Sequence, residues 1–144
     1  MKLEELTGLT AEQKIKALII YDAYGYEKAD TNSIDLKSTK ELEDLYNELK
    51  GSDDFGSSMY DAMQEMRCSG TETGLTPAIT SRHYEIDSTA VKALDGSWVE
   101  FPYIHGGGKH SNPEECDWIN YARDIVCTEE EKVVLVRTFS VKDN

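Results

Sequence analysis

The residues best suited to chemistry lie in the run His105-Gly106-Gly107-Gly108-Lys109-His110. Three consecutive glycines let the backbone approach a ligand or turn its N–H groups toward a phosphate, and a neighbouring lysine adds positive charge. A phosphate-binding P-loop, however, has separated glycines and a Ser or Thr after its lysine, whereas His110 follows the lysine here. Glu114 and Glu115, expected in the first turn of a helix, would also repel a phosphate there. Two interpretations of the loop stay open, a mobile contact loop and a plain strand-to-helix turn.

The histidines of the chain are not spaced like metal ligands. No pair among His83, His105 and His110 has the separation that places two ligands on one helical face or across one tight turn. His105 and His110 also bracket a flexible triglycine, which is a poor frame for a metal. We therefore predict no metal site and no cofactor.

Cysteine catalysis would need a thiol beside a histidine, and nothing in the sequence indicates such a pair. Cys68, Cys116 and Cys127 are odd in number and widely spaced, so we interpret them as buried free thiols in a reducing compartment. Adjacent acids such as Asp53-Asp54 are expected in a chain with 28 acidic residues and do not indicate hydrolysis. The sequence predicts that the protein is not an enzyme.

Charge is the strongest compositional feature. The 144 residues include 28 acidic and 15 basic ones, a net charge of −13, and residues 1–70 and 71–144 carry −7 and −6. A field of this sign repels nucleic acid and anionic membranes and attracts a basic partner, although solubility alone is an alternative explanation. The N-terminus does not resemble a signal peptide, and no apolar run approaches membrane-spanning length. We expect a cytoplasmic protein that binds neither nucleic acid nor membranes directly.

The first half of the chain has helical patterns. Thr10-Ala11-Glu12-Gln13 and Ser38-Thr39-Lys40-Glu41 are capping boxes, each followed by apolar residues at helical spacing. Ser58 opens a third helical pattern that Gly70 would end. Residues 70–80 have the composition of a loop, and each half alone would have a thin core. We therefore predict a single domain over residues 1–144, mainly helical in 1–70 and mainly strand in 71–144.

The second half favours antiparallel strands. Asp95-Gly96 is a strong hairpin signal between strands predicted at Arg82–Leu94 and Trp98–Ile104, and Pro102 favours an edge position or a bulge. Asn112-Pro113 begins a short helix predicted to run to about Ala122. Arg123–Cys127 and Lys132–Val141 predict a final hairpin, with the last strand central and buried on both faces. The fold class is therefore α+β, with N-terminal helices on a mainly antiparallel sheet of about four strands.

Aromatic residues near the glycine loop predict a contact surface. We expect Trp98, Tyr103 and Trp118 to flank the loop from His105 to His110 and to bind a macromolecular partner. Tyr24 and Tyr26 have two interpretations, as exposed aromatics near acids at an interface or as residues packed on the sheet.

Several segments of the second half resemble small bacteriophage and prophage accessory proteins. They are Asp95-Gly-Ser-Trp-Val, the triglycine loop, Asn112-Pro-Glu-Glu, Asp117-Trp118 and Cys127-Thr-Glu-Glu-Glu. The resemblance carries over no catalytic residue. It implies an inhibitor of a host defence or nucleic-acid-handling protein, of the anti-CRISPR or antirestriction kind, acting in the host cytoplasm on a basic protein or nucleoprotein complex.

Some such inhibitors mimic the charge of DNA. The interspersed basic residues of this chain favour specific protein binding over simple mimicry. The alternative is a small-molecule or nucleotide sponge, or a small metal-dependent enzyme, built on the Gly-Gly-Gly-Lys-His loop. The sequence does not indicate the oligomeric state.

Overall fold

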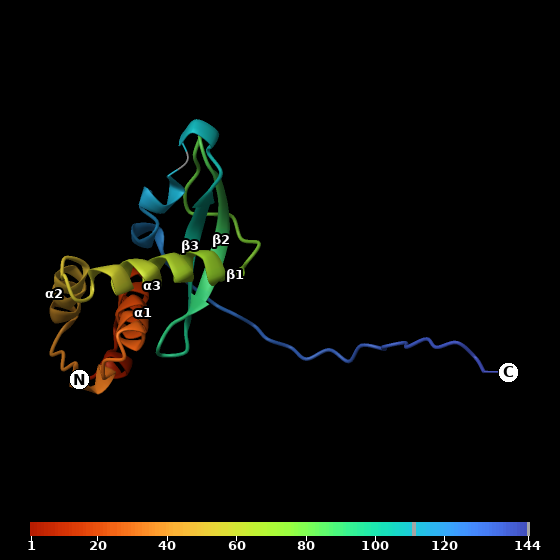
Figure 1. Cartoon of the computed structure of the whole chain (residues 1–144), viewed down its shortest axis with the longest axis horizontal. Coiled ribbons are helices and arrows are strands. Elements are labelled where there is room, and N and C mark those ends of the chain that lie inside the picture. The colour runs from red at the N-terminus through yellow and green to blue at the C-terminus, as the bar shows by residue number, and fades with distance from the viewer. Residues whose placement is uncertain (111, 144) are drawn as a thin grey trace.

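Figure 1 shows the computed structural model of the chain, which describes residues 1–110 and 112–143. Three helices come first: α1 (Ala11–Tyr26), α2 (Thr39–Lys50) and α3 (Gly56–Ser69). An antiparallel sheet follows, formed by β1 (Thr71–Glu72), β2 (Glu85–Lys92), β3 (Trp98–His105) and β4 (Arg123–Ile125) in the order β1-β2-β3-β4. The predicted α+β layout is confirmed.

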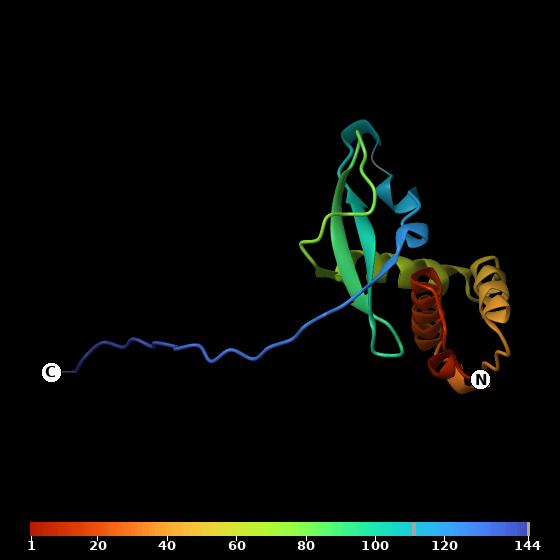
Figure 2. The same ribbon diagram turned by 180° about the vertical axis from the view of Figure 1, so that it is seen from behind.

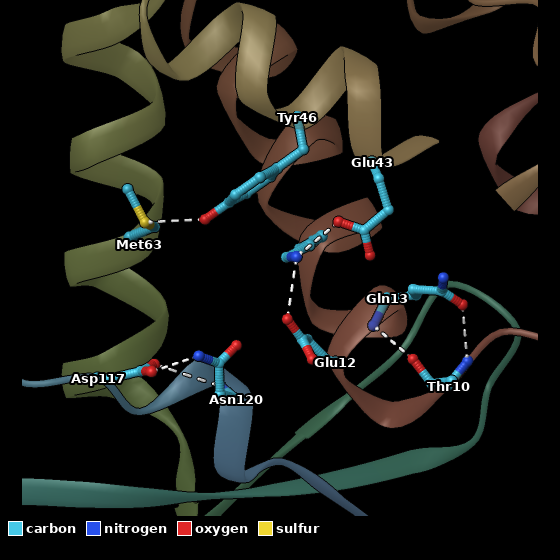
Figure 3. A network of polar contacts seen from close by, with 9 residues as sticks. Thr10, Glu12, Gln13, Glu43, Tyr46, Met63, Asp117 and Asn120 are labelled. Atoms are coloured by element: carbon cyan, nitrogen blue, oxygen red, sulfur yellow. Dashed lines mark hydrogen bonds and ion pairs between the residues drawn. The ribbon is translucent and has the colours of Figure 1, made fainter. Parts of the chain in front are cut away.

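The first two helices begin where side chains satisfy the free N–H groups of the first turn. Before α1, the Gln13 amide donates to the Thr10 hydroxyl at 3.2 Å, and the Thr10 amide donates to the Gln13 side chain at 3.0 Å (Figure 3). Ser38 caps α2 by accepting from the amide of Glu41 at 3.3 Å. These contacts span three residues, so a sequence pattern predicts them correctly.

One core joins the helices to the sheet. Its fully buried members include Ile15, Ile19, Ile20, Leu42, Met59 and Phe101. Helix α1 packs against α2, α3 and β3, and the ring of Phe101 meets that of Trp118 with centroids 4.8 Å apart. The two halves of the chain therefore share their apolar interior.

Pro102 lies where β3 has a strand neighbour on one side only. It is opposite Ser88 of β2, whereas β4 pairs with β3 only from Trp98 to Glu100. The carbonyl oxygen of Ser88 accepts from the Thr73 amide on the other side of β2, so Ser88 and Pro102 are not a hydrogen-bonded pair. The missing N–H of proline therefore faces away from β2 and interrupts no ladder.

The chain after β4 differs from the prediction. The hairpin of Arg123–Cys127 with Lys132–Val141 is absent, and the expected central strand is wrong, because residues 126–143 have no helix or strand. Figures 1 and 2 show these residues, which we call the C-terminal arm, running away from the body of the molecule. The fourth strand is instead β1, from a segment predicted as a loop. An alternating apolar pattern describes residues that fit a sheet, but it does not supply an edge to pair with.

The segment before β4 is also less regular than expected. The helix predicted from Asn112 to Ala122 is replaced by two 3-10 turns, Pro113–Glu115 and Ile119–Tyr121, separated by extended backbone at Cys116. Asn112 makes no side-chain cap hydrogen bond, so the helix start that its type predicts is not stabilised.

The three cysteines are free, but the prediction that they are buried is wrong. Cys68 and Cys127 are exposed, and Cys116 is partly exposed. Cys68 lies in the last turn of α3, and Cys127 follows β4 in the C-terminal arm, so neither position faces the core.

Candidate functional site

The triglycine loop that follows β3 is a turn that only glycine can make without strain. Gly106, Gly107 and Gly108 all have positive φ, at 73°, 92° and 51°. A Cβ on Gly107 would lie 2.8 Å from ring atoms of Tyr84 and 2.9 Å from the carbonyl oxygen of His110. The backbone conformation and the close approach of Tyr84 therefore account for the glycines.

The turn brings two distant histidines together. Lys109 and His110 lie exposed in a 3-10 turn, Gly108–His110. The ring of His110 packs against that of His83, with centroids 4.1 Å apart and planes tilted by 39°. Across residues 1–110 and 112–143, however, no group of three or more His, Cys, Asp or Glu is placed to hold a metal ion.

His105 ends β3 with its ring between two carboxylates. Its Nε2 lies 2.8 Å from Oδ2 of Asp87, and its Nδ1 lies 3.6 Å from Oε2 of Glu85. The ring also stacks on Tyr103, with centroids 5.0 Å apart and planes 21° apart. Covalent catalysis with a histidine as base needs a nucleophilic side chain within hydrogen-bond reach of the ring. In the described part of the chain, no thiol or hydroxyl hydrogen-bonds a histidine ring.

Arg67 is a buried cation that the sequence does not single out. It is 6% exposed, its Nη2 donates to the carbonyl oxygen of Ile104, and its guanidinium carbon lies 4.9 Å from the centroid of the Tyr103 ring. It lines a pocket together with Glu72 and Asp87. These carboxylates disfavour an anionic ligand, so the contacts of Arg67 mainly join α3 to β3. An arginine in the last turn of a helix is ordinarily solvent-exposed, so the sequence does not predict that Arg67 is buried.

The structure separates the three aromatics that were expected to flank the loop. Tyr103 and His105 lie together beside it. Trp98 begins β3, seven residues before His105, which is roughly 23 Å along an extended strand. Trp118 is 4% exposed and packs on Phe101 in the core, so its ring is covered by the protein itself. The nine residues predicted to bind a partner therefore do not form one surface.

A different set of residues gathers on α1 and α3, which pack against each other. Burial, and then the charge of Glu65, raises the pKa of Asp22. Burial, and then the charges of Glu65, Asp22 and Asp61, raises the pKa of Tyr26. Every charge that shifts these two groups is negative. We call Asp22, Tyr26, Asp61 and Glu65 the acidic-aromatic surface.

The structure gives the two tyrosines different environments. Tyr26 is 51% exposed and lies among acids, whereas Tyr24 stacks on Phe55, the residue before α3, with centroids 5.0 Å apart. The i,i+4 spacing of Asp22 with Tyr26, and of Asp61 with Glu65, predicts two stripes. Which stripes meet depends on how the two helices cross, and the sequence does not indicate it.

In the part of the chain that the structure describes, no helix has the length and apolar character needed to cross a membrane. The chain was also compared with protein-family models, with curated proteins and with solved structures. None of these comparisons found a match.

Proposed function

We propose that this protein acts by binding a basic macromolecular partner, as a phage-type inhibitor of a host defence or nucleic-acid-handling protein of the anti-CRISPR or antirestriction kind. The acidic-aromatic surface carries the proposal. There, acids from two helices surround a half-exposed tyrosine, and no cation is among the charges that shift its pKa. A channel that binds DNA or RNA is lined with Lys and Arg, so its potential is complementary to this surface.

The partner we propose is a protein or nucleoprotein complex in the host cytoplasm. A net charge of −13 repels free nucleic acid and anionic membranes. An exposed tyrosine supplies contact area beyond charge, and such aromatics dominate the binding energy of many protein interfaces. Charge therefore speeds the encounter, and Tyr26 gives the complex its specificity.

We further propose that the chain binds and does not catalyse. The glycines of the triglycine loop are explained by its positive φ angles and by the ring of Tyr84. His105 is held by Asp87 and stacks on Tyr103. These contacts give the loop and its histidine structural roles that need neither a substrate nor a nucleotide.

A pull-down from bacterial lysate tests the proposal. The full chain should recover a basic, nucleic-acid-binding protein or complex at low salt, and added DNA or RNA should compete with it. High salt should weaken the capture through a slower on-rate, because exposed charges are screened beyond about 8 Å at physiological ionic strength.

Two double variants with the same net charge distinguish the effect of the acidic-aromatic surface on capture from the effect of net charge. Asp61→Lys with Glu65→Lys should abolish capture, whereas Asp53→Lys with Asp54→Lys changes net charge equally and should retain it; all four residues are exposed. Equal loss in both variants would contradict a specific surface. Recovery of no protein, together with a small molecule or metal tightly bound to the purified chain, would favour the sponge or enzyme alternative.

A further inference from the structure

We propose that two copies of this chain exchange their C-terminal arms, each arm adding as a β-strand to the sheet of the other copy. The arm lies on different elements from the acidic-aromatic surface, so this proposal does not depend on the proposed function.

The arm carries apolar side chains that lie exposed. Its segment Lys132–Val141 contains neither Gly nor Pro and is rich in β-branched residues, a composition typical of a buried strand. Its apolar side chains are Val133, Val134, Leu135, Val136, Phe139 and Val141, and they are 74% to 104% exposed. Soluble proteins rarely leave such a run uncovered, and a run of this kind marks an interaction segment.

The backbone of the arm is equally free to pair. Among the described residues, its only polar contact is an ion pair between Lys132 and Glu130 at 3.3 Å. Strand β4 (Arg123–Ile125) is the last in the sheet and pairs only with β3, so its outer edge is open. An extended segment with unpaired backbone groups and an open sheet edge are the two components of strand addition.

An apolar groove runs across one face of the sheet, from β1 to β4, and reaches that edge at Ile125. Its lining includes Thr71, Leu75, Ala90, Trp98, Ile125 and Val126, and its volume is ≈ 290 Å³. Successive strand residues point to opposite faces of a sheet. Thr89 and Phe101 face Gly70 at the end of α3, so their neighbours Ala90 and Trp98 lie on the other face, on the floor of the groove. Leu75 in the groove wall is 48% exposed, so the apolar lining is open to a docking strand.

Charge indicates that the occupant is a second copy. Residues 132–142 hold three basic residues and no acidic one, a net +3, whereas residues 1–131 hold 27 acidic and 12 basic residues, a net −15. Glu72 lies in the groove lining itself. The whole arm, residues 126–143, is net −1 because it includes Glu129–Glu131 and Asp143, but its strand-like segment 132–142 is basic and complements the acidic body, residues 1–125, of another molecule of the same chain.

The path of the chain favours exchange over closure onto its own sheet. Residues 125–128 form one wall of the groove, and the arm leaves from there and runs away from the body (Figure 2). A return into its own groove would require a reversal at Glu129-Glu130-Glu131, which lacks the Gly, Asn or Asp of tight hairpin turns. Exchange about a two-fold axis needs no reversal, and it fills both grooves in a closed dimer.

Analytical ultracentrifugation of the full chain tests the proposal. Wild type should sediment with twice the chain mass of 16.2 kDa. Leu135→Asp with Phe139→Asp in the arm, and Leu75→Asp in the groove, should each give 16.2 kDa monomers with unchanged circular dichroism, because all three side chains are exposed. Tyr60→Asp is the matched control: this tyrosine is 53% exposed on α3, outside the groove, and the variant should stay dimeric.

Mixing the arm variant with the groove variant identifies the exchange itself. In a mixed dimer the intact arm of the groove variant can dock in the intact groove of the arm variant. The mixture should therefore form some dimer, although neither variant dimerises alone. A monomeric wild type would overturn the proposal. So would a dimer that both variants keep, or a mixture that stays monomeric. Hydrogen exchange adds a second readout, since the arm amides should be protected in the wild-type dimer and unprotected in the groove variant.

Discussion

Replacing Arg123 by Met should destabilise the fold strongly, because it leaves a buried carboxylate without its cation. Glu100 is 1% exposed, and its Oε1 accepts a hydrogen bond from Nε of Arg123 at 2.7 Å and lies 2.6 Å from Nη2 in the ion pair of the two residues. Its Oε2 has no partner among the described residues. Nη2 of Arg123 also donates to the carbonyl oxygen of Thr76 at 2.8 Å, which holds the loop before β2. Met keeps an apolar stem of similar reach and removes only the charge and the donors.

The magnitude follows from the unequal burial of the two partners. Removing one partner of a fully buried ion pair costs about 3–5 kcal/mol of unfolding free energy. The Arg123 side chain is 45% exposed, so water already weakens the pair, and we expect the lower end, about 3 kcal/mol. Lys14→Met is the matched control. Lys14 pairs with Asp124 at 2.7 Å, but that aspartate is 57% exposed, so its loss should cost less than about 1 kcal/mol.

Urea denaturation at pH 7, followed by circular dichroism, measures both changes. Arg123→Met should lower the midpoint with an unchanged slope, whereas Lys14→Met should hardly move it. A double-mutant cycle with Glu100→Gln should show a coupling, because the neutral amide no longer needs the cation. The reasoning is refuted if Arg123→Met costs no more than Lys14→Met, or if the two changes of the cycle are additive.

Three further predictions concern local contacts. Gly107→Ala should lower the free energy of unfolding, measured in urea titrations, by at least about 1 kcal/mol more than Gly108→Ala. Both glycines have positive φ, but of the two only Gly107 would place an added Cβ within 3 Å of another atom. Equal costs would contradict this prediction. Burial raises the pKa of Tyr46 to about 12, so its stabilising effect, complete below about pH 10, is lost as pH rises through the folded pKa. Between pH 9 and 12 wild type should therefore lose about 2 kcal/mol more than Tyr46→Phe, and parallel losses would argue against the shift. Asp22→Asn should leave stability at pH 7 unchanged or raise it by up to about 0.5 kcal/mol in thermal melts, since burial and then Glu65 disfavour the charged carboxylate; a clear loss would show that the charge is stabilising.

The sequence predicts the elements whose contacts span a few residues. The capping box at Thr10 begins α1 as expected, and Ser38 caps α2, although the Glu41 side chain accepts from the Lys37 amide and so does not complete the expected box. Donor and acceptor lie three residues apart in both caps. Asp95-Gly96 forms the expected hairpin, with Gly96 at φ 86° and the Ala93 amide donating to the carbonyl oxygen of Ser97 at 2.8 Å. The order of these elements is enough to predict an α+β fold.

The candidate site depends on contacts between distant segments. The sequence predicts that Trp118 and Trp98 both flank the triglycine loop. In the structure the ring of Trp118 is buried against Phe101, and Trp98 is the first residue of β3. Asp22 and Glu65 are 43 positions apart, and they come together only because α1 packs on α3. Such contacts depend on helix crossing and on strand order, which a linear pattern does not specify.

The segment Lys132–Val141 shows most clearly what a sequence pattern does not predict. The pattern in Lys132–Val141 predicts a buried strand that the structure does not form, because pairing is a property of two segments and a local pattern describes only one of them. By itself, therefore, the sequence determined the three N-terminal helices, the hairpin at Asp95-Gly96 and the negative charge. The tertiary structure alone decided which acids meet, which tryptophan is covered and that the arm lies unpaired. These outcomes depend on the packing of whole elements, whereas the local ones depend on hydrogen bonds within a single turn.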